Sequence, residues 1–153
     1  MRTFGDEARG RRVPTMLRFG SWVGGDMDGH PDVHAKTIRE SCARHHQLVI
    51  NRYFLEVQKL AERLSQSASR VGVSPEVLSR IETYRNLVPG ARSATPQSHD
   101  RMPYRVLLGQ VAERLRAAYD GRSGQYERCE QLVADLELIA ASLEAHQGAN
   151  AGL

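Results

Sequence analysis

Residues 33–65 read VHAKTIRESCARHHQLVINRYFLEVQKLAERLS, and their periodicity decides the fold class. Apolar and aromatic side chains recur at spacings of three and four, which places them along one face of an α-helix. That predicted face consists of Ile38, Cys42, His45, Val49, Tyr53, Val57, Leu60 and Leu64. Asp32 is the candidate N-cap, and the small residues of 65–74 end the helix. At about 30 residues the helix would be roughly 45 Å long, which is long for a small independent domain.

Three more helices are expected after this one. Ser74 as N-cap and Pro75 at the first helical position predict the start of the second, and Pro89 and Gly90 end it. The third and fourth cover about residues 104–121 and 125–145, and no segment alternates as a strand would. Their apolar faces comprise Val77, Ile81, Tyr84 and Val88, then Tyr104, Leu108, Val111, Leu115 and Ala118, then Cys129, Leu132, Leu136, Ile139 and Leu143. The sequence therefore predicts a mostly α chain.

Composition and charge exclude several classes of protein. The 153 residues are 41% hydrophobic and 25% charged, as in a globular protein and unlike collagen, a disulfide scaffold or a disordered chain. The net charge is +3, and the arginines lie among acidic residues without an aromatic stacking platform, so no nucleic-acid partner is expected. There is no signal-peptide pattern and no apolar run that could span a membrane, which predicts a cytoplasmic protein. The two cysteines, Cys42 and Cys129, are expected to be reduced thiols in the core.

Chemical information is densest in residues 19–33, FGSWVGGDMDGHPDV. A calcium-binding EF-hand counted from Asp26 fails at His30, Pro31 and Thr37. The alternating Asp and His residues could form a transition-metal site, but such residues before a helix are more often turn and capping residues. A phosphate cradle at a helix N-terminus remains a third alternative, although the loop has no Walker lysine and no GxGxxG spacing. Spacing alone does not choose among these alternatives.

The same stretch resembles the FxSWMGGDRDGNPNVT signature of phosphoenolpyruvate carboxylase. The likeness continues through HAKTIRESCARHHQLVINRYF in the long helix, PYRVLLGQVAERL at 103–115 and EQLVADLELIAASLEAHQGANAGL at 130–153. It thus covers about residues 14–153, with the signature loop at 19–33, and leaves 1–13 as an irregular N-terminal segment. The glycine-aspartate signature is the specific part, and the helical segments support its order.

The resemblance implies a fold and a reaction for a larger parent enzyme. The family's enzymes are lyases built as a parallel barrel wrapped in many helices, so this chain would be a four-helix segment of a larger α/β-barrel enzyme. They add bicarbonate to phosphoenolpyruvate, giving oxaloacetate and phosphate that feed the tricarboxylic acid cycle. They use Mg²⁺ or Mn²⁺ without biotin, and they are commonly homotetramers. The metal ligands belong to barrel strands that this sequence lacks.

Most of the family's catalytic motifs are absent from these 153 residues. There is no TAHPTE-like motif with the catalytic histidine, no FHGRGG loop and no GYSDSxKD motif. We therefore expect an internal fragment that holds no catalytic residue and no metal ligand, is inactive alone and needs the rest of the same polypeptide. An autonomous helical protein-interaction module is the alternative, because four amphipathic helices could close one bundle.

The resemblance assigns candidate residues to the wall of the active site. Trp22 matches the signature tryptophan, which helps to line an apolar pocket suited to holding CO₂ away from water. The other wall candidates, which shape the loop, are Gly24, Gly25, Asp26, Asp28 and Gly29. Met27 and His30 depart from the Arg and Asn of the common signature, so any contact of that arginine is lost. His45 is expected to be a hydrogen-bonded core histidine, and Arg105 to form an ion pair on a helix surface.

Overall fold

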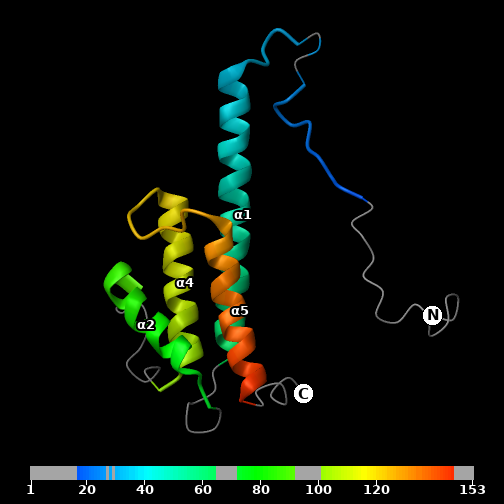
Figure 1. Cartoon of the computed structure of the whole chain (residues 1–153). Coiled ribbons are helices and arrows are strands. Elements are labelled where there is room, and N and C mark those ends of the chain that lie inside the picture. Colours follow the sequence, from blue (N-terminus) through cyan, green and yellow to red (C-terminus); the bar gives the residue numbers. More distant parts are fainter. Residues whose placement is uncertain (1–16, 27, 29, 65–71, 92–100, 147–153) are drawn as a thin grey trace, which may run out of the picture. The chain divides into compact units, whose positions relative to one another are not determined.

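A computed structural model describes residues 17–26, 28, 30–64, 72–91 and 101–146 (Figure 1). These residues form four helices and no strand: α1 (Ala35–Arg63), α2 (Pro75–Leu87), α4 (Pro103–Asp120) and α5 (Cys129–Ala145). The chain divides into two compact units, Met1–Ala43 and Arg44–Leu153, and the division falls inside α1. None of the helices in the described residues combines the length and apolar character needed to cross a lipid bilayer. The mostly α prediction is confirmed.

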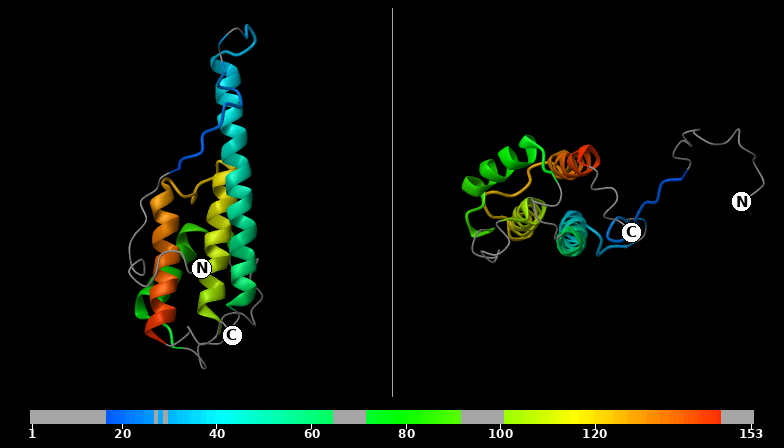
Figure 2. Two further views of the ribbon diagram at one scale, coloured as in Figure 1. Left: turned by 90° about the vertical axis from the view of Figure 1, so that its right-hand side faces the viewer. Right: turned by 90° about the horizontal axis from the view of Figure 1, so that it is seen from below.

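The C-terminal unit is built around α4, which supplies much of its core. The right-hand view of Figure 2, which is seen from below, shows α2, α4 and α5 side by side with the part of α1 that follows Ala43. Tyr104, Leu107, Leu108, Val111 and Leu115 of α4 are each 1% exposed or less. The buried apolar side chains that surround them come from the other helices and the residues after α2: Val57, Val77, Ile81, Tyr84, Val88, Ala91 and Ile139. Burying these side chains is the main source of stability for the unit.

The prediction of which face of α1 packs against the core is wrong for the N-terminal part of the helix. Cys42, His45, Val49 and Tyr53 are exposed, whereas Val57 is buried. The residues that pack against the core lie on a neighbouring face and comprise Ile50, Phe54, Val57, Leu60, Ala61 and Leu64. Apolar residues extend over much of the circumference of α1, so the same spacings fit two faces, and only the packed partners distinguish them.

Three local predictions fail for related reasons. Cys42 and Cys129 are both exposed, so neither is a core thiol, and His45 is not a core histidine. Asp32 is not the N-cap of α1, because the helix begins at Ala35 and the carbonyl of His34 accepts the first hydrogen bond, from the amide of Ile38 at 3.1 Å. Each prediction relied on sequence position, while burial and capping depend on how the chain approaches the helix.

The ends of the other helices follow the predicted chemistry in part. Ser74 precedes Pro75 at the start of α2 as predicted, but its hydroxyl makes no capping bond, and its Oγ is buried without a hydrogen-bond partner. Gly121 ends α4 in the left-handed conformation, with φ 66°, which glycine adopts without steric cost. The fourth helix begins at Cys129 rather than near Gln125. The carbonyls of Gly124 and Gln125 instead accept hydrogen bonds from the Arg114 side chain, at 3.1 and 3.2 Å.

Candidate functional site

The signature loop precedes α1 and contains a tight turn at Trp22–Gly25. The amide of Gly25 donates a hydrogen bond to the carbonyl of Trp22 at 3.0 Å. Gly24, the third residue of the turn, has φ 72°. A positive φ at this position is required in type II turns and favours glycine strongly. Gly24 of the signature therefore has a local structural reason to be glycine.

The other end of the loop is tied to the first turn of α1. The hydroxyl of Thr37 donates to the carbonyl of Asp32 at 3.0 Å and lies 3.2 Å from Nδ1 of His34. The amide of Val33 donates to the carbonyl of His30 at 3.2 Å. Thr37 thus ties the end of the loop to the first turn of α1, although it does not take over the N-cap role expected of Asp32.

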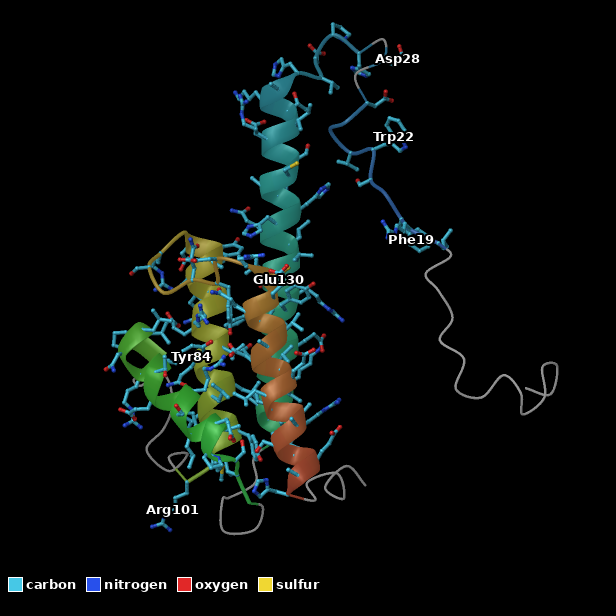
Figure 3. The ribbon with its side chains drawn as sticks, viewed as in Figure 1. Phe19, Trp22, Asp28, Tyr84, Arg101 and Glu130 are labelled. Atoms are coloured by element: carbon cyan, nitrogen blue, oxygen red, sulfur yellow. The ribbon has the colours of Figure 1, made fainter. Side chains whose placement is uncertain are left out.

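Large apolar side chains in the first part of the loop and just before it are open to solvent. Trp22 is 78% exposed and Phe19 is 91% exposed, and Leu17 and Val23 are exposed as well. Figure 3 shows Phe19 and Trp22 standing out from the extended stretch that leads into the loop. A soluble surface rarely gathers four such side chains in seven residues without a role in binding or packing.

The acidic wall candidates are also exposed. The amide of Asp28 lies 3.4 Å from a carboxylate oxygen of Asp26, an Asx-turn contact within the loop. Gly25 has room around it, because an added Cβ would have its nearest neighbour, the carbonyl of Trp22, at 3.8 Å. Gly29 and Met27 lie outside the described residues. The structure therefore brings Trp22, Gly24, Gly25, Asp26 and Asp28 into one loop but assembles no catalytic constellation from them.

The described residues do not form a metal site. Nowhere in them do three or more His, Cys, Asp or Glu side chains gather as ligands for an ion. Asp26 and Asp28 share a turn, but no third carboxylate or imidazole joins them.

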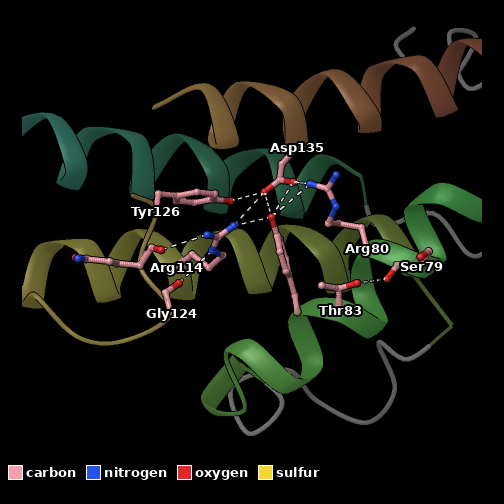
Figure 4. Close-up of polar contacts among 9 residues, drawn as sticks. Ser79, Arg80, Thr83, Arg114, Gly124, Tyr126 and Asp135 are labelled. Atoms are coloured by element: carbon pink, nitrogen blue, oxygen red, sulfur yellow. Dashed lines mark hydrogen bonds and ion pairs between the residues drawn. The ribbon is translucent and has the colours of Figure 1, made fainter. Parts of the chain in front are cut away.

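A second polar feature, which the sequence analysis did not identify, lies inside the C-terminal unit. Asp135 of α5 is fully buried and accepts hydrogen bonds from Tyr84 at 2.7 Å and from Tyr126 at 2.6 Å (Figure 4). Arg80 forms an ion pair with the same carboxylate. Arg114 donates to the hydroxyl of Tyr84 at 2.6 Å and lies 4.0 Å from Asp135. We call these five residues the Asp135 cluster.

The environment of the Asp135 cluster keeps its two phenols neutral. Burial, and then the hydrogen bond and charge of Asp135, raise the pKa of both Tyr84 and Tyr126, so both stay protonated as donors. Partial burial lowers the pKa of Arg80, but its hydrogen bond to Tyr84 and the charge of Asp135 outweigh this and raise it. The guanidinium of Arg114 also stacks 3.8 Å from the ring centre of Tyr126.

The Asp135 cluster has a structural role in this unit. Its carboxylate is already matched by two phenols and two guanidinium groups and is 0% exposed, so no substrate reaches it. A sequence signal existed, because Asp135 lies three residues after Leu132 and four before Ile139, on the apolar face of α5. A carboxylate on such a face indicates a buried charge that requires partners.

Comparisons with known proteins give the family. The model of the phosphoenolpyruvate carboxylase family matches residues 3–152. The phosphoenolpyruvate carboxylase of Xanthomonas oryzae pv. oryzae is 44% identical over 140 residues, which cover 92% of this chain and 16% of that relative. Those of Burkholderia vietnamiensis and Chromobacterium violaceum are 35% and 32% identical, covering 91% and 95% of this chain and 15% and 16% of the relatives. No solved structure matches the chain.

These matches, which extend over the signature loop, define one class of protein, a family of carboxylases. The chain belongs to the phosphoenolpyruvate carboxylase family. It spans only 16% of the length of the Xanthomonas relative that it matches. The family that the resemblance of the signature loop predicts is thus confirmed.

Proposed function

We propose that this chain is an internal part of a phosphoenolpyruvate carboxylase and supplies one wall of its active site. The parent reaction would join bicarbonate to phosphoenolpyruvate and yield oxaloacetate and phosphate. The observation that carries the proposal is the signature loop, which presents Trp22 at 78% exposure in a chain that the family model matches over 3–152. An exposed indole on a loop with a defined turn is suited to complete a pocket formed with other parts of the polypeptide.

The proposed chemistry assigns Trp22 a defined task. In the parent reaction, a bicarbonate oxygen attacks the phosphorus of phosphoenolpyruvate, which forms carboxyphosphate and the enolate of pyruvate. Loss of phosphate releases CO₂, and the enolate carbon then attacks it to form oxaloacetate. The indole of Trp22 would present an apolar wall that keeps water from the CO₂ and the enolate. The glycines and Asp26 would set the course of the loop.

The remaining machinery is proposed to lie elsewhere in the parent. Mg²⁺ or Mn²⁺ would stabilise the enolate charge when bound, with ligands outside these residues and without biotin. The barrel, the arginines that bind phosphate, the tetrameric assembly and a cytoplasmic location are proposed with it. Coverage supports the placement of the barrel and the phosphate-binding arginines elsewhere, since a chain that matches 16% of the Xanthomonas enzyme has room for few of these elements.

A chimera tests this proposal directly. This chain would replace the matching 140-residue segment of the Xanthomonas oryzae enzyme, and bicarbonate-dependent oxaloacetate formation would be measured. We expect activity in the chimera and none in the chain alone. Trp22→Ala should lower kcat/KM by about 100-fold, whereas Trp22→Phe, which keeps an apolar wall, should retain more activity. An active isolated chain, or equal activities of the Trp22→Ala and parent chimeras, would refute the proposal.

A further inference from the structure

One face of α1 contacts the signature loop at the Trp22–Gly25 turn and again near its end. Thr37 and Ser41 are four residues apart and therefore share this face. The hydroxyl of Thr37 binds the carbonyl of Asp32 at 3.0 Å, near the end of the loop. A Cβ added to Gly24, near its beginning, would overlap the hydroxyl oxygen of Ser41 and lie 2.7 Å from Ser41 Cβ and 3.4 Å from the Thr37 carbonyl oxygen. The Trp22–Gly25 turn is thus seated against α1.

We propose that Ser41 is a positioning residue: its side chain fills the space that a side chain at position 24 would need, so the Trp22–Gly25 turn packs on α1 only with glycine there, and this turn sets where Trp22 stands. The consequence for carboxylation rests on the proposed function, but the seating does not depend on it. No motif of the signature includes Ser41, because it lies eight residues beyond the end of the loop at Val33. Only the folded contact with Gly24 identifies it.

The contact is particular to Gly24 among the loop glycines that the structure describes. An added Cβ at Gly20 would meet nothing within 4 Å, and one at Gly25 would have only the Trp22 carbonyl at 3.8 Å. Gly24 is restricted in two ways, because its φ is positive and because Ser41 occupies the space of a side chain. Substitution at position 24 should therefore move the loop away from α1, whereas substitution at position 20 should not.

The contact between Gly24 and Ser41 affects the position of Trp22 through the backbone. Gly24 lies two residues after Trp22, and the hydrogen bond from Gly25 to the Trp22 carbonyl closes the turn between them. The Trp22 side chain is 78% exposed, so the backbone turn, rather than packing of the indole, holds its position in this chain. Lifting Gly24 from Ser41 would free Trp22 to move on the nanosecond timescale of loops.

Fluorescence anisotropy of Trp22 tests the seating, because Trp22 is the single tryptophan of the sequence. In the 153-residue chain, Gly24→Ala should lose most of the difference in anisotropy between the folded and the urea-unfolded chain. Gly20→Ala, the matched control, should keep it. Gly24→Ala combined with Ser41→Gly should recover part of the loss, because the atoms that the new Cβ overlaps are removed. Helicity at 222 nm should stay unchanged in all three variants.

Kinetics of the chimera supply the functional readout. Gly24→Ala should lower kcat/KM by at least about tenfold, and the added Ser41→Gly should restore part of it. Equal anisotropy of Gly24→Ala and Gly20→Ala, or no recovery in the double variant, would overturn the role of Ser41. An inactive chimera with the predicted anisotropy pattern would instead reject the proposed function and leave the seating supported.

Discussion

The signature loop and the Asp135 cluster each combine carboxylate groups with aromatic rings, but the loop exposes these groups and the cluster buries them. Trp22 is 78% exposed and Asp26 and Asp28 are exposed, whereas Asp135 is 0% exposed and bound by two tyrosines and two arginines. The loop leaves its aromatic and acidic side chains exposed, whereas the carboxylate of Asp135 is matched by partners within its own unit. A motif that defines a family therefore need not contribute to the stability of the chain that carries it.

The largest effect should come from removing the charge at the centre of the cluster. Asp135→Ala leaves Arg80 and Arg114 without their buried anion, and it should lower the free energy of unfolding by about 3–5 kcal/mol, measured by urea denaturation at 222 nm. Glu137→Ala, an exposed acid on the same helix, should change it by no more than about 0.5 kcal/mol. Equal effects of the two variants would show that the Asp135 cluster does not stabilise the folded chain.

Core packing should give the next effect. Leu108 of α4 is 0% exposed, so Leu108→Ala should cost about 2–5 kcal/mol in urea denaturation. Leu78 of α2 is 52% exposed, and Leu78→Ala is the matched control, with an expected change of about 0.5 kcal/mol or less. If Leu78→Ala were as costly as Leu108→Ala, the core assigned to the C-terminal unit would be wrong.

The tyrosines of the cluster should make the unit sensitive to alkali. The pKa of Tyr126 is raised in the folded state, so above about pH 10 the unfolded chain loses the phenol proton while the folded chain keeps it. Stability is therefore fully present below about pH 10 and falls above it, by up to about 1.4 kcal/mol per pH unit for this tyrosine.

Tyr126→Phe tests this dependence by denaturation at a series of pH values. It should flatten the decline above about pH 10, whereas Tyr119→Phe, at a side chain that is 47% exposed, should leave the slope unchanged. Identical slopes for the parent chain and Tyr126→Phe would contradict the assignment of a protonated, buried Tyr126.

The smallest effect on stability should come from the loop. Trp22→Ala should change the free energy of unfolding by about 0.5 kcal/mol or less, because the side chain is already 78% exposed. Acrylamide should quench Trp22 fluorescence readily in the 153-residue chain and less in the chimera, where the proposed pocket covers it. A loss of stability comparable to that of Leu108→Ala would show that the loop is packed after all.

Local chemistry made much of the fold predictable. The bounds of α4 follow from Pro103 and Gly121, and the start of α2 follows from Pro75, because both residue types act on their own backbone. The signature glycines were expected to shape the loop, and Gly24 does so with a positive φ in the Trp22–Gly25 turn. The loop was thus recognisable as a unit before its geometry was known.

Long-range contacts explain what the sequence analysis missed. The partners of Asp135 lie up to 55 residues away, so no spacing rule connects them. The helix α5 begins at Cys129, and the carbonyl of Gly124 before it accepts a hydrogen bond from Arg114, ten residues earlier in the chain. The role proposed for Ser41 depends on Gly24, seventeen residues earlier in the chain.

The sequence by itself determined the helical character, the signature loop and the family, because periodicity, proline, glycine and a contiguous motif are local properties of the chain. Only the tertiary structure decided which face of α1 packs, how the charge of Asp135 is matched and which residue meets Gly24. The physical reason is that burial, charge pairing and steric contact depend on the groups that folding brings together, which lie far apart in the sequence.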